Sequence, residues 1–202
     1  MPLLGALSTR WYRSIRRYRL QWSVDEKESL EAAIHEEVLL HPHDPLWPSM
    51  FAAERDRLSA LLPGAFIELQ HVGSTAIGGL RAKPIIDILA GVESMAMAKA
   101  LAEPICASGY TTSAEFNASL IDRQWFMRWR DGHRTHHLHL VVHGGKTWRE
   151  WITFRDRLSA DGQFAARYDT LKAQLAERHG TDREAYTQAK SDFVHQVLAL
   201  RP

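Results

Sequence analysis

The stretch from His71 to Gly91, HVGSTAIGGLRAKPIIDILAG, constrains the fold of this chain more than any other. It opens with glycines and small residues and continues into the apolar run PIIDILA, in which Asp87 is the one acid. Aliphatic residues on both sides of this acid predict a strand that is buried on both faces. A carboxylate buried in such a strand is costly unless it is paired or binds a metal. The stretch therefore predicts a buried sheet with a chemical role for Asp87.

The glycine-rich part of this stretch does not have the sequence of a Walker A loop. Gly73 and Gly78 have the required separation, but Gly79 and Leu80 follow where a lysine and a serine or threonine are needed. Small residues nevertheless let backbone N–H groups approach a phosphate closely. The segment is either a phosphate cradle of another geometry or a tight connection between strands, and Asp87 downstream favours the cradle.

The composition is that of an ordinary globular protein, with 202 residues, 45% hydrophobic and 24% charged. A net charge of +1 gives no strong signal for nucleic acid or a membrane surface as a partner. No apolar run reaches the roughly 18 residues of a membrane span, and no basic segment opens a signal peptide. The single cysteine, Cys106, lies in an apolar helical pattern. We therefore expect a cytoplasmic protein in which Cys106 packs in the core.

The N-terminal segment carries an uneven charge, because residues 10–19, RWYRSIRRYR, hold five arginines and no acid. Such a segment could be an organelle transit peptide, or a basic arm that contacts anionic lipid or RNA. The pattern favours an amphipathic extension that packs on the domain or on a partner subunit. We place this extension at residues 1–36 and expect that it could join two copies of the chain.

Turn residues and apolar periodicity divide the chain into elements, with the proline-rich segment 41–48 as the first strong break. The patterns predict helices over 25–40, 47–62, 94–108, 146–160, 164–179 and 182–200. They predict strands over 65–72, 84–90, 109–116, 119–130 and 134–143. This order predicts an α+β or mixed α/β domain with a C-terminal helical layer.

Histidines form a second chemical group in the predicted strand HRTHHLHLVVH. Alternate side chains share one face of a strand, so His137, His139 and His143 point one way and His136 points the other. Two imidazoles separated by one residue can bind one metal ion or contact a phosphate. We therefore predict that His137 and His139 form a site together with Asp87.

Basic residues near these motifs could neutralise a phosphate chain. We predict this role for Lys83 and for either Arg128 or Arg134. Lys172 and Lys190 could also reach a phosphate, but the helical pattern around them favours exposed positions for both.

The motifs HVGSTAIGGLRAKPIIDI and RTHHLHLV, with FRDRL and YDTLKAQLA nearer the C-terminus, resemble the GrpB (UPF0157) family from about Glu37 to Leu200. That family is placed in the nucleotidyltransferase-fold superfamily, and related domains occur fused to dephospho-CoA kinase. The resemblance implies one domain over residues 37–202, with a small mixed sheet flanked by helices. It also implies a Gly-Ser element and three strand acids that hold two Mg²⁺ ions and a nucleoside triphosphate.

Carried over to this chain, the resemblance matches Gly73 and Ser74 to the Gly-Ser element, and with Thr75 they would cradle phosphate. Asp87 matches one acid of the pair, but the partner position holds Leu89, which cannot bind a metal. One aspartate is too few for an ordinary site of two Mg²⁺ ions, because Mg²⁺ prefers oxygen ligands.

Three explanations stay open for this departure. One metal, Mg²⁺ or Mn²⁺, could bind to Asp87 and His139; a softer metal such as Zn²⁺, Mn²⁺ or Ni²⁺ could bind through His71, His137 and His139; or a nucleotide could bind without reaction. Further carboxylates are offered by Glu68 and Glu115. We expect a nucleotidyltransferase-like protein that transfers a nucleotide from a nucleoside triphosphate to a hydroxyl group. The alternatives are a binding module for a nucleotide or a coenzyme A precursor, and a histidine-metal hydrolase.

Overall fold

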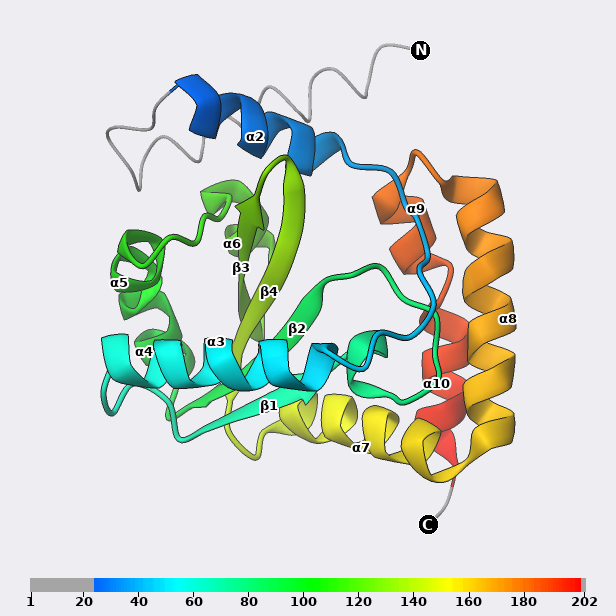
Figure 1. Cartoon of the computed structure of the whole chain (residues 1–202). Helices are drawn as coiled ribbons and strands as arrows, with labels where there is room; N and C mark the ends of the chain where they lie inside the picture. Colours follow the sequence, from blue (N-terminus) through cyan, green and yellow to red (C-terminus); the bar gives the residue numbers. More distant parts are fainter. Residues whose placement is uncertain (1–23, 201–202) are drawn as a thin grey trace.

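The computed structural model of the chain describes residues 24–200. The arginine-rich segment 10–19 lies outside these residues, and so does most of the predicted extension 1–36. The described part begins with helix α2 (Val24–His35), which lies along the β3–β4 hairpin (Figure 1).

A four-stranded mixed sheet forms the centre of the molecule, in the order β1-β2-β4-β3 (Figure 1). Its strands are β1 (Glu68–Val72), β2 (Ile86–Val92), β3 (Arg123–Arg130) and β4 (His133–Val142). The central pair, β2 and β4, is parallel, and the two outer pairs are antiparallel. Asp131 and Gly132 join β3 to β4 with positive φ angles of 49° and 77°, which suit a two-residue hairpin loop. The predicted mixed sheet is confirmed.

Both faces of the sheet are covered, as the apolar run around Asp87 predicts. On one face, Ile86 and Ile88 of β2 and Leu138 and Leu140 of β4 form the main core. The helices on this side are α3 (Trp47–Leu61), α4 (Met95–Ala100) and α5 (Ala102–Ala107). Cys106 lies in this core at 1% exposure, which confirms its predicted packing role.

The other face carries Asp87 and is covered from its two ends. Leu30 of α2 packs there on Trp125 and Met127 of β3, and Trp148 of α7 packs on Leu89 and Val141. The C-terminal helical layer continues beside it, in agreement with the prediction (Figure 1). It consists of α7 (Lys146–Ala160), α8 (Gly162–His179), α9 (Arg183–Gln188) and α10 (Ser191–Ala199).

Three predicted elements differ from the structure. Residues 109–116 are not a strand: Thr111 forms a single bridge with Met127, and the Ser113 side chain then caps helix α6 (Ala114–Ser119). Serine and threonine side chains compete with a strand ladder by hydrogen-bonding to the local backbone. The predicted helix 94–108 is divided at Leu101 into α4 and α5. The predicted helix 182–200 is divided into α9 and α10, which begins after Lys190.

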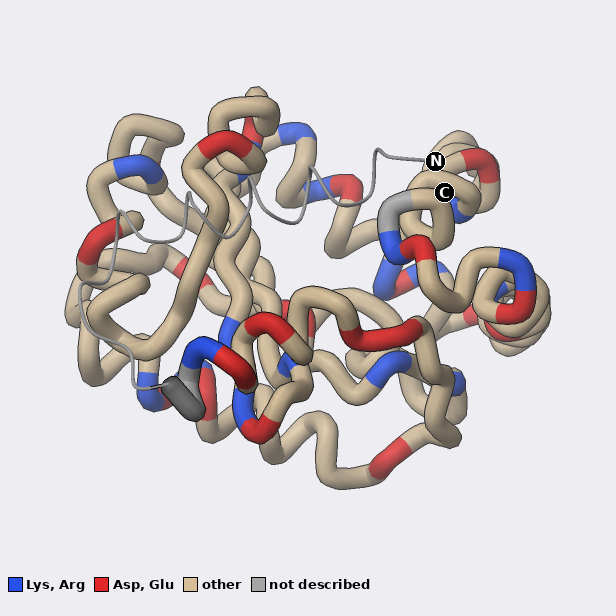
Figure 2. Tube along the Cα trace, turned by 90° about the horizontal axis from the view of Figure 1, so that it is seen from above, with Lys and Arg blue, Asp and Glu red and all other residues tan. Residues whose placement is uncertain are grey.

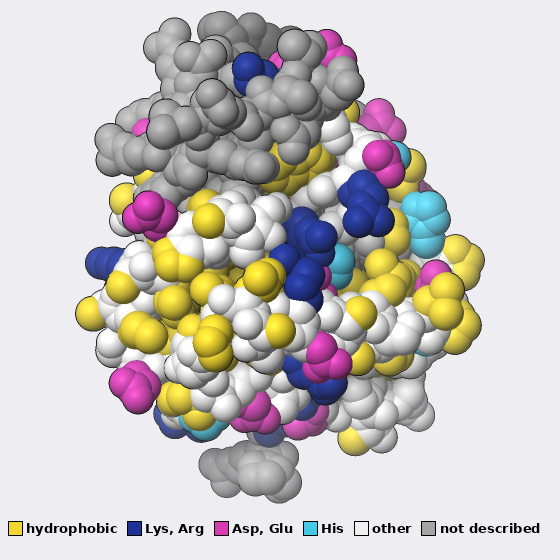
Figure 3. Space-filling model, turned by 60° about the vertical axis from the view of Figure 1, so that its left-hand side comes forward, with side chains coloured by type: hydrophobic (Ala, Val, Ile, Leu, Met, Phe, Trp, Pro, Cys, Tyr) yellow, Lys and Arg dark blue, Asp and Glu magenta, His cyan; other side chains and the backbone are white. Residues whose placement is uncertain are grey.

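The charges agree with the small net charge of the sequence. Acidic and basic residues are interspersed along the described chain (Figure 2). Figure 3 shows one local group of basic side chains near the middle of a face, with a histidine beside it. None of the described helices is both long enough and apolar enough to cross a membrane.

Candidate functional site

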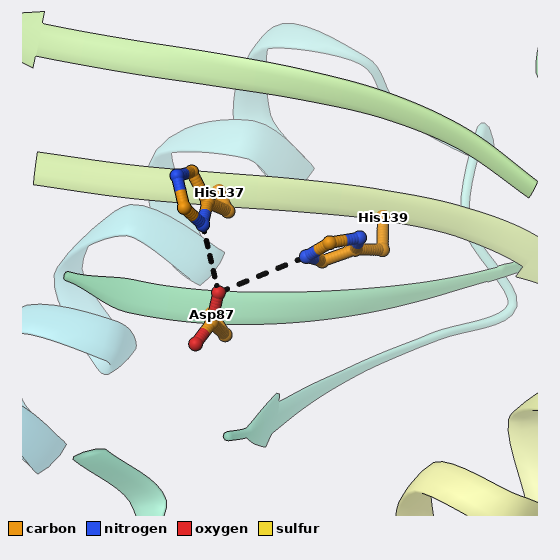
Figure 4. Close-up of side chains that lie close together, drawn as sticks. All are labelled: Asp87, His137 and His139. Carbon is orange, nitrogen blue, oxygen red and sulfur yellow. Dashed lines mark hydrogen bonds and ion pairs between the residues drawn. The ribbon is translucent and has the colours of Figure 1, made fainter. Parts of the chain in front are cut away.

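The centre of the candidate site is the parallel pairing of β2 with β4. The register places Asp87 opposite His137 and Leu89 opposite His139, so all four side chains share one face of the sheet. His137 Nδ1 lies 3.0 Å and His139 Nε2 lies 3.7 Å from the same oxygen, Asp87 Oδ1 (Figure 4). Ligand atoms of Asp87, His137 and His139 lie within 4.8 Å of one another. We call these three residues the His-Asp cluster.

Burial and hydrogen bonding set the charges of the His-Asp cluster. Burial alone would raise the pKa of Asp87, but hydrogen bonds from His137 and His139 hold that pKa well below its usual range. Burial lowers the pKa of His137 to about 3 and also lowers the pKa of His139, despite the neighbouring carboxylate. At neutral pH the cluster therefore consists of one carboxylate and two neutral imidazoles. Each of these groups can bind a cation without first losing a proton.

The outer nitrogens of the two rings have no hydrogen-bond partner among residues 24–200. His137 Nε2 and His139 Nδ1 are buried, and neither makes a hydrogen bond to the residues that the structure describes. In most metal sites a second residue fixes the tautomer of each histidine through this nitrogen. Because the Asp87 carboxylate only accepts hydrogen bonds, the ring proton of His137 lies on Nδ1, and binding of a cation by this nitrogen requires the proton to move to Nε2.

The glycine-rich loop begins directly above Asp87. Gly73 has a φ of +72°, and a Cβ at this position would lie 2.3 Å from Asp87 Oδ2. Glycine is therefore required both for the backbone conformation and for the close approach. Ser74 follows at the start of the short 3₁₀ helix η1 (Ser74–Ala76) and hydrogen-bonds to Tyr168 of α8. The third residue, Thr75, is buried and donates a hydrogen bond to the Ile85 carbonyl, so it holds the loop in place.

Basic residues lie close enough to Asp87 to interact with it electrostatically. Asp87 acts to raise the pKa of Lys83 and of Lys190, but burial outweighs this and lowers the two values to about 7 and about 8. Arg134 interacts with His137 and Lys83, because an irregularity in the β3–β4 register places it opposite Trp129. Its guanidinium donates to the Ala33 carbonyl of α2. Lys83, Arg134 and Lys190 thus lie within electrostatic range of the His-Asp cluster.

Two of the predicted site residues lie elsewhere. His71 is on the opposite face of β1 from Val72, which pairs with Asp87, and its ring stacks on Phe51 of α3. The ring turns away because neighbouring residues of a strand point to opposite faces. Arg128 also lies on the α3 side of the sheet, where it forms a 2.6 Å ion pair with Glu54.

Four further residues that the sequence suggested for the site, two lysines and two glutamates, also differ from expectation or lie away from the cluster. Lys172 and Lys190 were expected on exposed helix surface, and this is wrong for both: Lys172 is 1% exposed beside Asp169, and Lys190 is mostly buried. Glu68 is at the far end of β1, where it contacts His143. Glu115 lies in α6, within hydrogen-bonding distance of Ser113. Neither glutamate belongs to the His-Asp cluster.

Aromatic residues that the sequence did not single out enclose the cluster. The Trp151 ring of α7 lies 4.6 Å from the His139 ring, and Trp125 lies 5.4 Å from the His137 ring, centroid to centroid. The guanidinium group of Arg123 lies over the Trp151 ring, 5.9 Å from its centroid. The one sequence signal for Trp151 was its spacing of three residues from Trp148, which puts both on one side of α7.

The donor set fits one kind of metal site and not the other. A pair of Mg²⁺ ions requires several carboxylates, but Leu89 occupies the second acid position on the same face and is fully buried. The two-Mg²⁺ site implied by the resemblance therefore does not fit this chain. Two imidazoles and one carboxylate do fit a single Zn²⁺, Mn²⁺ or similar transition-metal ion.

Together, the fold and the site describe a mixed α/β domain with a histidine-aspartate cluster under a glycine-rich loop. The family pattern described as GrpB protein matches residues 37–200 of the chain. The chain therefore belongs to the GrpB family. Helix α2, which packs on the sheet through Leu30, lies outside the matched residues.

Similarity to known GrpB proteins, in sequence and in structure, supports this assignment. The chain is 36% identical over 166 residues to glutamate-rich protein GrpB of Alkalihalophilus pseudofirmus, which covers 80% of this chain and 94% of that protein. The crystal structure of the conserved protein GrpB from Enterococcus faecalis superposes with a TM-score of 0.70 at 29% identity, over 79% of this chain and 94% of that one.

Some relatives are much longer than the matched region. A dephospho-CoA kinase of Mycolicibacterium paratuberculosis is 31% identical over 178 residues, which are 77% of this chain but 44% of that protein. The chain also spans only 42% and 64% of the length of two UPF0157 proteins, from Bacillus subtilis and Pseudomonas aeruginosa. The matched region thus occurs within longer chains.

Proposed function

We propose that this GrpB chain is a nucleotidyltransferase-like protein that binds one divalent transition metal and a nucleoside triphosphate at the His-Asp cluster. One observation carries the proposal: Asp87, His137 and His139 converge within 4.8 Å beneath a loop that only glycine can bring against the carboxylate. The proposed reaction transfers a nucleotide from the triphosphate to a hydroxyl acceptor.

Each part of the site has a separate role in this proposal. Asp87, His137 and His139 would hold the metal, which would supply Lewis-acid stabilisation of charge on phosphoryl oxygens. Gly73 and Ser74 would place backbone N–H groups near the phosphates. Lys83 and Arg134 would offset the negative charge of the phosphate chain. The surrounding tryptophans would limit the access of water and so strengthen these electrostatic interactions.

Thermal unfolding of the metal-stripped protein tests the binding half of the proposal. The protein would be heated with each nucleoside triphosphate in the presence of Mg²⁺, Mn²⁺ or Zn²⁺. A ligand at about 100 times its dissociation constant adds about 2.7 kcal/mol of stability. We expect a large shift with a transition metal and one triphosphate together, and no shift in Asp87→Asn.

Asp56→Asn is the matched control, because Asp56 is 68% exposed on α3 and lies outside the cluster. It should keep the full response to metal and nucleotide. A folded Asp87→Asn protein that still binds metal with wild-type affinity would remove Asp87 from the proposed site.

A nucleotide-binding module without transfer is the second candidate, and Leu89 in the second acid position favours it. Release of pyrophosphate from a bound nucleoside triphosphate, measured after addition of hydroxyl-bearing acceptors that can receive the nucleotide, separates the two candidates. Binding accompanied by metal-dependent release supports the transferase. Tight binding without release under any of the three metals supports the binding module, for which coenzyme A precursors are further ligands to try.

A further inference from the structure

Three cations, Lys83, Lys190 and Arg183, lie within electrostatic range of one another near the His-Asp cluster. Lys83 precedes β2, whereas Lys190 lies between α9 and α10. The two ammonium groups lie 5.3 Å and 4.4 Å from the centroid of the same ring, that of Tyr186 in α9. Tyr186 is 1% exposed, so the ring provides a rigid apolar support for both lysine side chains.

Neither lysine has a counter-ion in the part of the chain that the structure describes. No hydrogen bond or ion pair reaches Lys83 Nζ or Lys190 Nζ from residues 24–200, the side chains of residues 24–26 and 184 not being described. Arg183 pairs with Glu36 through Nη2, but its Nη1 atom is buried without a hydrogen-bond partner among the described residues.

Lys172, in the same helical layer, is a buried lysine whose ammonium group does have hydrogen-bonding and ionic partners. It is 1% exposed, but its ammonium donates to the Arg81 carbonyl and lies 3.6 Å from Asp169. Lys83 lacks such partners, and its electrostatic neighbours are mostly cations, namely Arg183, Lys190 and Arg134, with Asp87 as the one anion. Like charges that lie this close repel one another, so the arrangement costs free energy unless an anion binds between them.

We propose that Lys83, Lys190 and Arg183 form an anion site for the diphosphate part of a phosphorylated ligand, which we call the lysine clamp. This assignment rests on the proposed function in one respect, because it gives the phosphate chain of the proposed nucleotide its position next to the metal ligands. It deepens that function by assigning part of the site to the C-terminal helices. A diphosphate carries enough charge to contact several cations at once, which a monoanion such as chloride cannot do.

Calorimetric titration with inorganic pyrophosphate in EDTA tests the lysine clamp without any metal. We expect the wild-type protein to bind pyrophosphate more tightly than orthophosphate or sulfate. Lys190→Met should bind pyrophosphate at least about tenfold more weakly, because one charge-assisted contact is lost. Lys190→Arg should retain most of the affinity. Lys99→Met, at an exposed lysine on α4, is the matched control and should bind as the wild type does.

The stability of the ligand-free variants distinguishes a binding role from a structural one. Removing an unpaired buried cation should leave the melting temperature of Lys83→Met and Lys190→Met unchanged or higher, while pyrophosphate binding falls. A folded Lys190→Met protein with wild-type affinity for pyrophosphate would overturn the proposal, as would a wild-type protein that binds no pyrophosphate. Metal uptake depends on the His-Asp cluster alone, so a protein that binds pyrophosphate in EDTA but takes up no metal would refute the metal site and leave the lysine clamp intact.

Discussion

Gly73 sets the distance between the glycine-rich loop and Asp87. Its Cα hydrogen faces Asp87 Oδ2 at a separation that leaves no room for a methyl group. We expect Gly73→Ala to move either the loop or the carboxylate, and so to abolish metal binding as well as destabilise the fold. Urea unfolding and Zn²⁺ titration of the purified variant measure the two effects.

Gly79→Ala is the control for this substitution. Gly79 has a similar φ of +79°, but nothing lies within 4 Å of a Cβ at that position. The control should show only the cost of a left-handed alanine, about 1–2 kcal/mol, and should bind metal normally. Equal effects of the two substitutions would mean that contact with Asp87 is unimportant.

Single residues of the site were predictable from sequence where their chemistry conflicted with their surroundings. Asp87 stood out because an acid is rare in an apolar strand, and alternation along β4 placed His137 and His139 on one face. Lys190 gave no such signal, because its burial depends on Tyr186 and on the loop before β2, which no local pattern reveals. His71 and Arg128 were predicted as possible site residues, but the alternation of side chains along β1 and β3 places both on the other face of the sheet.

At the scale of elements, Glu54 attaches helix α3 to the sheet. It is 4% exposed and bonds to Arg57 on its own helix, to Arg128 of β3 and to the Tyr110 hydroxyl. Burial alone would raise the pKa of Glu54, but these partners hold that pKa below its usual value. The carboxylate is therefore ionised and fully paired, and it fixes α3 on the face opposite the site.

We expect Glu54→Ala to destabilise the protein by about 3–5 kcal/mol, because Arg128 and Arg57 are left partly buried without their anion. Chemical denaturation at pH 7 measures this difference. Asp56→Ala on the same helix should cost less than about 1 kcal/mol, since its partner Arg55 is exposed as well. A loss below 1 kcal/mol in Glu54→Ala would show that apolar packing alone holds α3 in place.

The two central strands and the hairpin were predicted correctly, whereas the polar segment 109–116 was not. The run IIDIL and the alternating HLHLVV gave β2 and β4, and the Asp-Gly pair gave the hairpin before β4. In residues 109–116, the Thr112 hydroxyl donates to the Trp125 carbonyl and the Ser113 side chain caps α6, so a loop and a helix cap form in place of a strand. The parallel pairing of β2 with β4 could not be read from either strand, because register depends on contacts between distant segments.

At the scale of the whole molecule, buried histidines make the fold sensitive to acid. Burial lowers the pKa values of His71 and His136 to about 4 and that of His137 to about 3. An unfolded histidine binds a proton below about pH 6.5, so between pH 6.5 and 4 the unfolded chain binds more protons than the folded one. The free energy of unfolding should therefore decrease as the pH falls through this range.

His136→Gln should make this decrease smaller by about 3.5 kcal/mol at most, since burial lowers the pKa of His136 from 6.5 to about 4 and one pH unit corresponds to about 1.4 kcal/mol. Glu54 opposes the shift and Arg128 reinforces it, so both must stay intact in the variant. Urea unfolding at pH 7, 6, 5 and 4.5 measures the slope. His195→Gln, at an exposed position on α10, is the control, and an unchanged slope in His136→Gln would contradict the expectation.

The parallel pairing of β2 with β4 has a consequence for the folding of the protein during its synthesis. Asp87 and His137 are separated by 50 positions along the chain, and the last lysine of the clamp is at position 190. A ribosome that has released only the glycine-rich loop and β2 exposes the aspartate without its histidines. The proposed site can therefore form only after residue 190 has been synthesised, and ligand capture would report that the segments from the glycine-rich loop to α10 have folded together.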